Sequence, residues 1–263
     1  MSTSQQRAPH CSRWWFGTWD RLVNGALGIC GEPKIVVPNG RLAVDFHLHT
    51  SFSHCSTSRP DDILLRASAL GLTAIAVMDH HYVEGALETV RRAEELKRLR
   101  MLPESFLVVP GVELNSTIGH VGALFVTEDL PEKLRPEKIV RAIHEAGGLA
   151  VAVHPYHSSG IGDAVFDAPF DAVEIECGSV FDPRLAQRNR TLALDPRLAQ
   201  AAKIGGSDAH YLKAVGSCYT VVDTESVSIE GLRAAILSGK CSAHSTDFAG
   251  RLQKILGLVP KLR

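Results

Sequence analysis

Short apolar runs alternate along this chain with longer stretches in which apolar residues recur at helical spacing. The apolar runs predict seven strands, because each is short and is bounded by polar, glycine or proline residues. Their ranges are 43–47, 73–78, 106–109, 120–126, 149–153, 171–175 and 219–222. The amphipathic stretches predict helices at 60–70, 84–100, 136–146, 183–190, 196–203 and 229–237.

Strand and helix alternate about seven times, which predicts a parallel sheet covered by helices. The count favours a closed or nearly closed α/β barrel over an open sheet. No glycine-rich phosphate loop opens any of the helices. We expect one barrel domain over 43–246, an N-terminal extension of unassigned role over 1–42, and a C-terminal tail over 247–263. The Trp-rich start of the chain predicts an amphipathic surface helix or packed extension, with a membrane or partner contact as the alternative.

Composition and charge narrow the class of protein. The chain has 263 residues, of which 45% are hydrophobic and 22% charged, as is typical of soluble globular proteins. A net charge of −1 provides no general attraction to nucleic acid. The six cysteines form no CxxC pair, which argues against a disulfide scaffold and favours a cytoplasmic location. No apolar run is long enough to predict a transmembrane helix.

Polar residues fall at the ends of the predicted strands. His47 and His49 stand two residues apart, so on a strand both imidazoles project to one side. Asp208 and His210 repeat this spacing. In a parallel barrel the carboxyl ends of the strands converge on one rim, where active sites are built. The residues at such ends are His47, His49, Asp79, His80, Glu113, His154, Glu176, Asp208 and His210, with His120 at the start of its strand.

Each of these histidines alone is more often a hydrogen-bonded structural residue than a ligand. Their joint occurrence with carboxylates at corresponding strand ends is hard to explain by packing. Buried imidazoles and carboxylates need partners, and divalent metal ions would satisfy many of them at once. The pattern therefore predicts a metal centre at the rim of the barrel.

The order HxH, DH, GxE, H, HP and SDxH resembles the PHP (polymerase and histidinol phosphatase) family over about residues 43–245. The resemblance implies a distorted seven-stranded (β/α)7 TIM-like barrel that holds two or three divalent metal ions. It implies a first metal on His47, His49, Glu113 and Asp208. Glu113 would bridge to a second metal held by His120 and His154, and a third metal would bind His80, His210 and a residue from the loop after HxH.

The ligand from that loop is where this sequence departs from the family, which commonly has an aspartate or histidine there. The candidates here are His54 and Cys55. We favour His54, because it keeps an imidazole ligand, whereas a Cys55 thiolate would suit zinc better than manganese. Asp79 is expected to orient an imidazole rather than to bind metal.

A ligand set rich in imidazole suits zinc, manganese or iron better than magnesium or calcium. Neighbouring metals can share a hydroxide that attacks phosphorus, so no protein nucleophile is needed. Glu113 and Asp208 are then the catalytic carboxylates. His157 follows the HP motif closely and could contact a phosphate or protonate the leaving oxygen, and an ordinary surface loop position is an equal alternative. No substrate-binding residue is assigned, although Arg184, Arg188, Arg190 and Lys213 are candidates.

The predicted function is a metal-dependent phosphoesterase that hydrolyses a small phosphorylated metabolite, a nucleotide or an oligonucleotide through a metal-bound hydroxide. Long nucleic acid is a weaker candidate, because no basic stripe with interleaved aromatic residues is present. The alternative is a non-catalytic metal-binding module that acts through a partner. Turnover of phosphate esters in the presence of manganese or zinc separates the two hypotheses.

Overall fold

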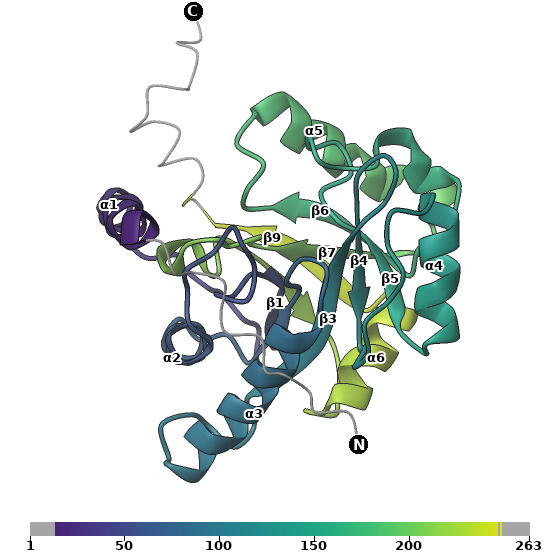
Figure 1. The fold of residues 1–263 in the computed structure, drawn as a ribbon. Coiled ribbons are helices and arrows are strands. Elements are labelled where there is room, and N and C mark those ends of the chain that lie inside the picture. The colour runs from purple at the N-terminus through teal and green to yellow at the C-terminus, as the bar shows by residue number, and fades with distance from the viewer. Residues whose placement is uncertain (1–13, 247, 249–263) are drawn as a thin grey trace, which may run out of the picture.

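The computed structural model describes residues 14–246 and 248, with side chains from residue 18 onward. One sheet organises the described residues, with its strands in the order β7-β6-β5-β4-β3-β2-β1-β8-β9 (Figure 1). The strands are β1 Leu42–Leu48, β2 Ala74–Val77, β3 Leu107–Asn115, β4 His120–Leu124, β5 Leu149–Ala152, β6 Ala172–Cys177, β7 Ala202–Gly206, β8 Cys218–Val222 and β9 Cys241–Ser245. The helices are α1 Trp14–Ile29, α2 Pro60–Ala69, α3 Glu84–Arg98, α4 Pro136–Glu145, α5 Pro183–Thr191 and α6 Ile229–Leu237.

The sheet curls until the segment after β7 meets the end of β1. The Asp208 amide donates to the His47 carbonyl at 2.8 Å, and the His49 amide donates to the Ala209 carbonyl at 3.2 Å. Leu48 and Ala209 form an isolated parallel bridge at the same place. The predicted nearly closed α/β barrel is therefore confirmed, and its closure lies next to the HxH motif.

The described residues form nine strands, two more than the sequence predicts. One of the two is β7. A helix was predicted over 196–203, but only Pro196–Leu198 forms a 3-10 turn, and the last two residues of that range belong to β7. β7 ends in Gly205 and Gly206, and a Cβ on Gly206 would lie 2.5 Å from the His47 Cβ. Close contact between β7 and β1 thus requires a glycine that weakens the strand pattern in the sequence. The other is β9, whose alternation of exposed and half-buried residues leaves no apolar run.

The prediction of an entirely parallel sheet is wrong. Four neighbouring pairs are antiparallel, namely β3 with β4, β4 with β5, β1 with β8, and β8 with β9. Only residues 116–119 separate β3 from β4. A connection this short permits a hairpin and excludes the crossover that parallel neighbours need.

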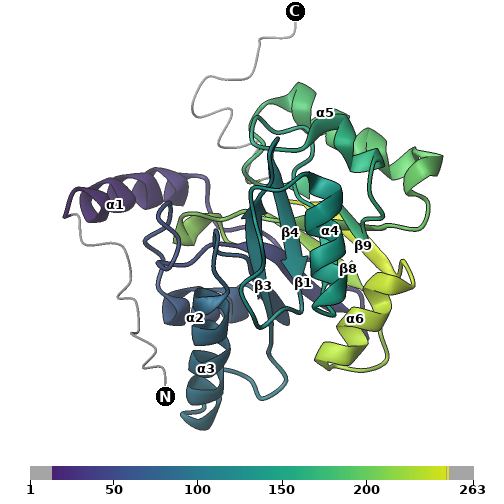
Figure 2. The same cartoon turned by 45° about the vertical axis from the view of Figure 1, so that its right-hand side comes forward.

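Three layers of apolar side chains hold the barrel together. The inner core joins strand residues such as Val44 and Phe46 to α6. One outer layer joins Ala43 and Leu48 to α2 and α3, and the other joins the outer face of β3–β6 to α4. Figure 2 shows these helices covering the sheet from outside. Burial of these apolar surfaces supplies the main driving force for folding.

A β-bulge in β1 sets the direction of the HxH motif. Asp45 pairs with Ile75 and Leu48 pairs with Val77, so β1 advances by three residues while β2 advances by two. The extra residue reverses the alternation: Phe46 lies in the inner core, whereas Leu48 packs outward against α2 and α3. The bulge therefore lets His47 face inward like Phe46 before it, toward Glu113 and Asp208.

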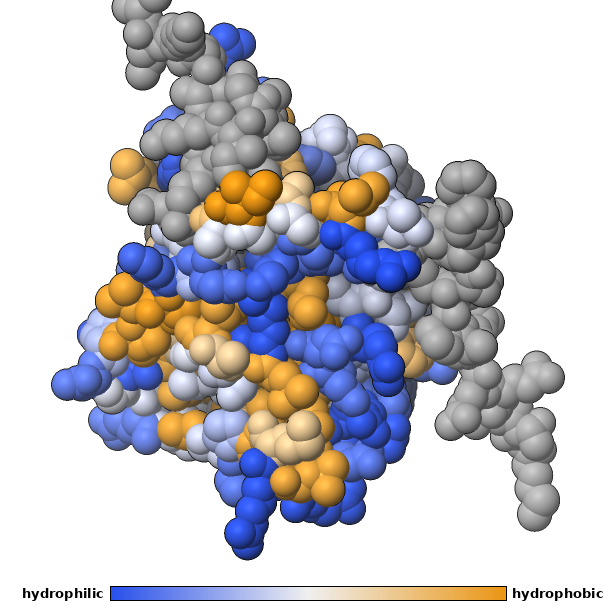
Figure 3. Space-filling model, turned by 90° about the vertical axis from the view of Figure 1, so that its left-hand side faces the viewer, coloured by the Kyte–Doolittle hydropathy of each residue, from blue (hydrophilic) through white to orange (hydrophobic). Residues whose placement is uncertain are grey.

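α1 packs beside the segment that follows β7. Trp19 Nε1 donates to the Tyr211 hydroxyl at 3.2 Å, and Asn24 Oδ1 accepts from the Lys213 amide at 2.9 Å. Leu27 is buried, whereas Leu22 on the same helix is 64% exposed. On this side of the molecule, hydrophobic groups flank a hydrophilic band (Figure 3). No helix in the described part of the chain is long and apolar enough to cross a membrane.

Candidate metal centre

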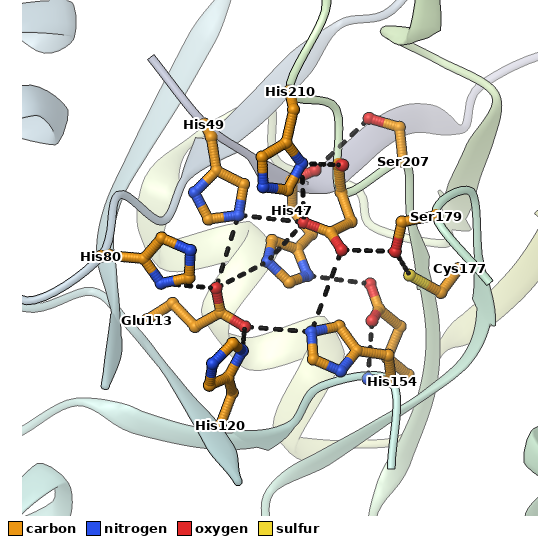
Figure 4. Close-up of polar contacts among 12 residues, drawn as sticks. His47, His49, His80, Glu113, His120, His154, Cys177, Ser179, Ser207 and His210 are labelled. Atoms are coloured by element: carbon orange, nitrogen blue, oxygen red, sulfur yellow. Dashed lines mark hydrogen bonds and ion pairs between the residues drawn. The ribbon is translucent and has the colours of Figure 1, made fainter. Parts of the chain in front are cut away.

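Glu113 lies at the centre of the polar cluster, with 1% of its surface exposed (Figure 4). Its Oε1 lies 2.9 Å from His120 Nδ1 and 3.0 Å from His154 Nε2. Its Oε2 faces three other imidazoles, those of His80 at 3.2 Å, His49 at 3.4 Å and His47 at 3.7 Å. Each carboxylate oxygen thus belongs to a different set of imidazoles, as a carboxylate that bridges two metal ions requires.

Asp208 closes the cluster from the other side of the barrel. Its Oδ1 lies 2.9 Å from His49 Nε2 and 3.4 Å from His47 Nε2, and its Oδ2 accepts a hydrogen bond from Ser179. Asp208 and His154 both have positive φ angles, 48° and 29°, which are uncommon for residues other than glycine. Such backbone strain is concentrated at functional sites.

Four groups of side chains could each hold a metal ion, because within each group the donor atoms all lie within 4.8 Å of one another. The groups are His47, His154 and Asp208; His47, His49 and Glu113; His80, Glu113 and His120; and His49, Cys55, His80 and His210. They bring together the nine ligands predicted from the sequence except His54. The His54 side chain is exposed, with its ring centroid 5.4 Å from that of His80, and Cys55 occupies the corresponding place in the group.

The residues fit a set of divalent metal ions. His47 Nε2 and His154 Nδ1 are buried and have no hydrogen-bond partner among the described residues. Buried polar atoms are nearly always paired, and a divalent cation would pair these. The donor set of imidazoles, carboxylates and one thiol matches zinc, manganese or iron.

Some ligands of the cluster are already in the form that binds metal, whereas others must first lose a proton. Burial lowers the pKa of His47 and His154, but the neighbouring carboxylates outweigh burial and raise both pKa values above the usual range. Burial raises the pKa of Glu113 and Asp208, but the attraction to His47 and the hydrogen bonds and charges of the other imidazoles together outweigh burial and hold both pKa values well below the usual range. Burial lowers the pKa of His80 to about 3 and also lowers the pKa of His210. Ionised carboxylates and neutral imidazoles are the forms that bind metal.

Burial, followed by the charges of Asp208 and Glu113, raises the pKa of the Cys55 thiol to about 12. The same two carboxylates would be neutralised by bound cations. Electrostatics around this thiol therefore depends on whether the centre is loaded with metal.

Glu174 is a buried carboxylate that the sequence analysis missed. It lies on β6, with Oε1 3.3 Å from His47 Nδ1 and Oε2 accepting from the His154 amide at 2.8 Å. Ala172 packs in the inner core and Val173 outside it, so alternation directs Glu174 inward. A charged residue between the apolar residues Val173 and Ile175 was the available signal. Carboxylates in this position orient metal-binding imidazoles and raise their basicity.

Glu176, the carboxylate chosen at the end of β6, pairs instead with Arg190 through two hydrogen bonds of 2.6 and 2.9 Å. Asp79 accepts from the Thr50 amide at 2.7 Å and from its hydroxyl at 2.6 Å. Asp79 therefore holds the loop after HxH, and the expectation that it orients an imidazole is wrong.

His157 is half-buried beside the cluster, with its ring centroid 5.4 Å from that of His154. His157 Nδ1 lies 3.3 Å from the Ser159 amide, which donates to it, and 2.8 Å from the Ser159 hydroxyl; an Nδ1 that accepts from both leaves the ring hydrogen on Nε2. Three of the four cations proposed as phosphate ligands are paired with carboxylates: Arg188 with Asp163, Arg190 with Glu176, and Lys213 with Glu32. These pairs lower their availability for a substrate.

The fold and the cluster define an α/β barrel with groups of donor atoms at its rim that could hold metal ions. A model of the PHP domain matches residues 45–157, and a model described as PHP-associated matches residues 199–241. The chain belongs to the PHP family, as its motifs predicted.

Similar proteins include an uncharacterized protein of Methanocaldococcus jannaschii. It is 34% identical over 146 residues, which are 51% of this chain and 81% of that protein. The fold resembles that of a two-domain protein from Bacteroides vulgatus containing a predicted PHP-like metal-dependent phosphoesterase. That protein is 20% identical, with a TM-score of 0.61 over 85% of this chain and 73% of the other. A lesion-specific endonuclease from Pyrococcus furiosus has a TM-score of 0.53 at 17% identity, over 77% and 57% of the two chains.

Proposed function

We propose that this chain is a metal-dependent phosphoesterase, with its active site at the cluster around Glu113. The observation that carries the proposal is the sharing of the two Glu113 oxygens between separate sets of imidazoles. Divalent metals bound there would lower the pKa of water toward neutrality and neutralise phosphoryl oxygens in the transition state. The predicted ligands are His47, His49, His80, Glu113, His120, His154, Asp208 and His210, together with one residue of the loop after HxH.

The protein side chains have positioning roles in this proposal. Glu113 and Asp208 hold the cations close together, and Glu174 fixes the His47 ring. His157, with a hydrogen on Nε2, can donate to a phosphoryl or leaving-group oxygen. Burial lowers its pKa, so the ring is neutral at neutral pH and adds no charge beside the centre.

A small phosphorylated metabolite, a nucleotide or an oligonucleotide remains the proposed substrate. The chain carries 28 Lys and Arg against 29 Asp and Glu, so no overall positive field draws it to a long polyanion. The fold likeness to an endonuclease makes nucleic acid a substrate that must be assayed. A cytoplasmic location stays a prediction.

The test uses purified protein loaded with manganese or zinc. The substrates are a chromogenic phosphomonoester, a chromogenic phosphodiester, nucleotides, a short oligonucleotide and a duplex with an abasic site. Glu113→Ala should lower kcat by at least about 10³-fold, since several kcal/mol of charge stabilisation depend on the cations it holds.

The matched control is Glu145→Ala, which removes an exposed carboxylate at the end of α4 and should leave turnover unchanged. Stoichiometric metal binding without turnover of any substrate would refute the phosphoesterase proposal and favour a non-catalytic module. Full activity in Glu113→Ala would refute this assignment of the site.

A further inference from the structure

The loop after β1 places a thiol in the metal centre. Cys55 Sγ lies within 4.8 Å of one ring nitrogen each of His49, His80 and His210. Among the described residues, Cys55 and His210 occur in this donor group alone, whereas His49 and His80 also belong to carboxylate groups. The thiol therefore marks one end of the cluster as chemically different from the rest.

The loop is folded so that position 55 is held in place. The Ser51 amide donates to the Ser58 carbonyl at 2.8 Å, and the Ser56 hydroxyl donates to the His49 carbonyl at 3.1 Å. Ser53 Oγ accepts from the His80 amide at 2.9 Å, which ties the loop to the end of β2. These bonds close the loop over the rim, so that Cys55 is only partly exposed.

The neighbouring His54 lies on the outer side of the same loop. Its side chain is exposed, and its ring stacks beside His81 at a centroid distance of 6.3 Å. The exposed His54 side chain lies outside the donor group, whereas the partly buried Cys55 belongs to it. The residue that enters it is Cys55.

Imidazole nitrogen and thiolate sulfur are both ligands that tetrahedral zinc takes in proteins. Donors around a tetrahedral zinc lie roughly 3.5 Å apart, so binding would draw these side chains slightly inward. The other three groups each contain Glu113 or Asp208, and a carboxylate oxygen also suits manganese. Soft thiolate sulfur favours zinc over manganese.

We infer that Cys55 is the protein ligand from this loop to a third metal ion, and that it makes this position selective for zinc over manganese. The inference rests on the metal centre of the proposed function and does not require that the centre be catalytic. It replaces His54, the ligand favoured from sequence, by its neighbour.

Cobalt titration of the full chain tests the inference, because a thiolate bound to Co²⁺ gives a near-ultraviolet charge-transfer band that imidazole and carboxylate ligands do not give. We expect the band in the wild-type protein. Cys55→Ser should lose the band and bind one metal ion fewer. Cys55→His should lose the band and keep the metal count, since an imidazole replaces the thiolate.

Two further variants serve as controls. His54→Ala and Cys241→Ser should both keep the band; Cys241 is a half-buried thiol on β9 and lies outside the donor groups. Absence of the band at full cobalt loading would overturn the inference, as would its survival in Cys55→Ser or its loss in His54→Ala. These readings on wild type, His54→Ala and Cys241→Ser stand even if Cys55→Ser does not fold.

Competition tests the selectivity in the wild-type protein. Zinc should abolish the cobalt band at a concentration at which manganese leaves it unchanged, and equal displacement by both metals would refute selectivity. Turnover of phosphate esters is measured separately. A band without turnover would support the ligand and refute the proposed function, whereas turnover without a band would do the reverse.

Discussion

Replacing Glu174 by glutamine would measure how strongly the protein scaffold prepares His47 for metal. The carboxylate contacts His47 Nδ1 at 3.3 Å and accepts from the His154 amide at 2.8 Å. Both Glu174 oxygens therefore act as acceptors. His47 Nδ1 must donate to one of them if His47 Nε2 is to be free as a metal ligand. Glutamine has one acceptor oxygen and one NH₂ group, so it satisfies only one of the two contacts.

The effect of Glu174→Gln on metal binding depends on which of the two contacts the glutamine oxygen keeps. If the amide oxygen stays on the His154 amide, the NH₂ group faces His47 Nδ1 and favours the tautomer with the hydrogen on Nε2. That tautomer cannot bind a metal ion through Nε2. Loss of such an orienting partner typically costs 10- to 100-fold in metal affinity, which corresponds to about 1.4 to 2.7 kcal/mol.

Metal affinity would be measured by competition with a chromophoric chelator, together with urea unfolding of the metal-free protein. The matched control is Glu176→Gln, two residues later on β6, whose carboxylate contacts Arg190 instead of an imidazole. Wild-type affinity in Glu174→Gln, or an equal loss in Glu176→Gln, would refute the orienting role.

Three further outcomes are expected. Gly206→Ala should destabilise the fold by about 1–3 kcal/mol in urea, since its Cβ would lie 2.5 Å from the His47 Cβ; an unchanged midpoint would contradict the close packing of β7 on β1. Ser228→Ala should cost about 1 kcal/mol, because Ser228 Oγ accepts from the Gly231 amide and caps α6; wild-type stability would show that the cap is dispensable. Zinc or manganese at about 100 times Kd should stabilise the protein by about 2.7 kcal/mol, or roughly 5–10 °C in Tm, and a Tm insensitive to metal and chelator would exclude a metal centre in the folded state.

Much of the barrel and of the donor cluster could be predicted from the sequence. Polar residues followed most of the apolar runs, and the convergence of strand ends predicted that His47, Glu113 and Asp208 are neighbours despite their separation along the chain. This inference needed only the alternation of apolar runs with helical stretches. It did not depend on the exact register of any strand.

Features that depend on register or on close packing could not be predicted. The bulge in β1 adds one residue without any marker such as glycine. β7 was missed because its glycines, which the approach to β1 requires, disfavour a strand pattern. The choice between His54 and Cys55 depended on the direction of adjacent side chains in a loop, which spacing alone does not determine.

The bulge in β1 separates two tasks that a single strand performs. Before the bulge, inward residues such as Val44 and Phe46 pack in the inner core. After it, the inward residues are histidines of the donor groups. A one-residue deletion between Asp45 and Leu48 would remove the bulge and exchange the inner and outer faces of the strand beyond it, so the imidazoles would leave the cluster although the composition is almost unchanged.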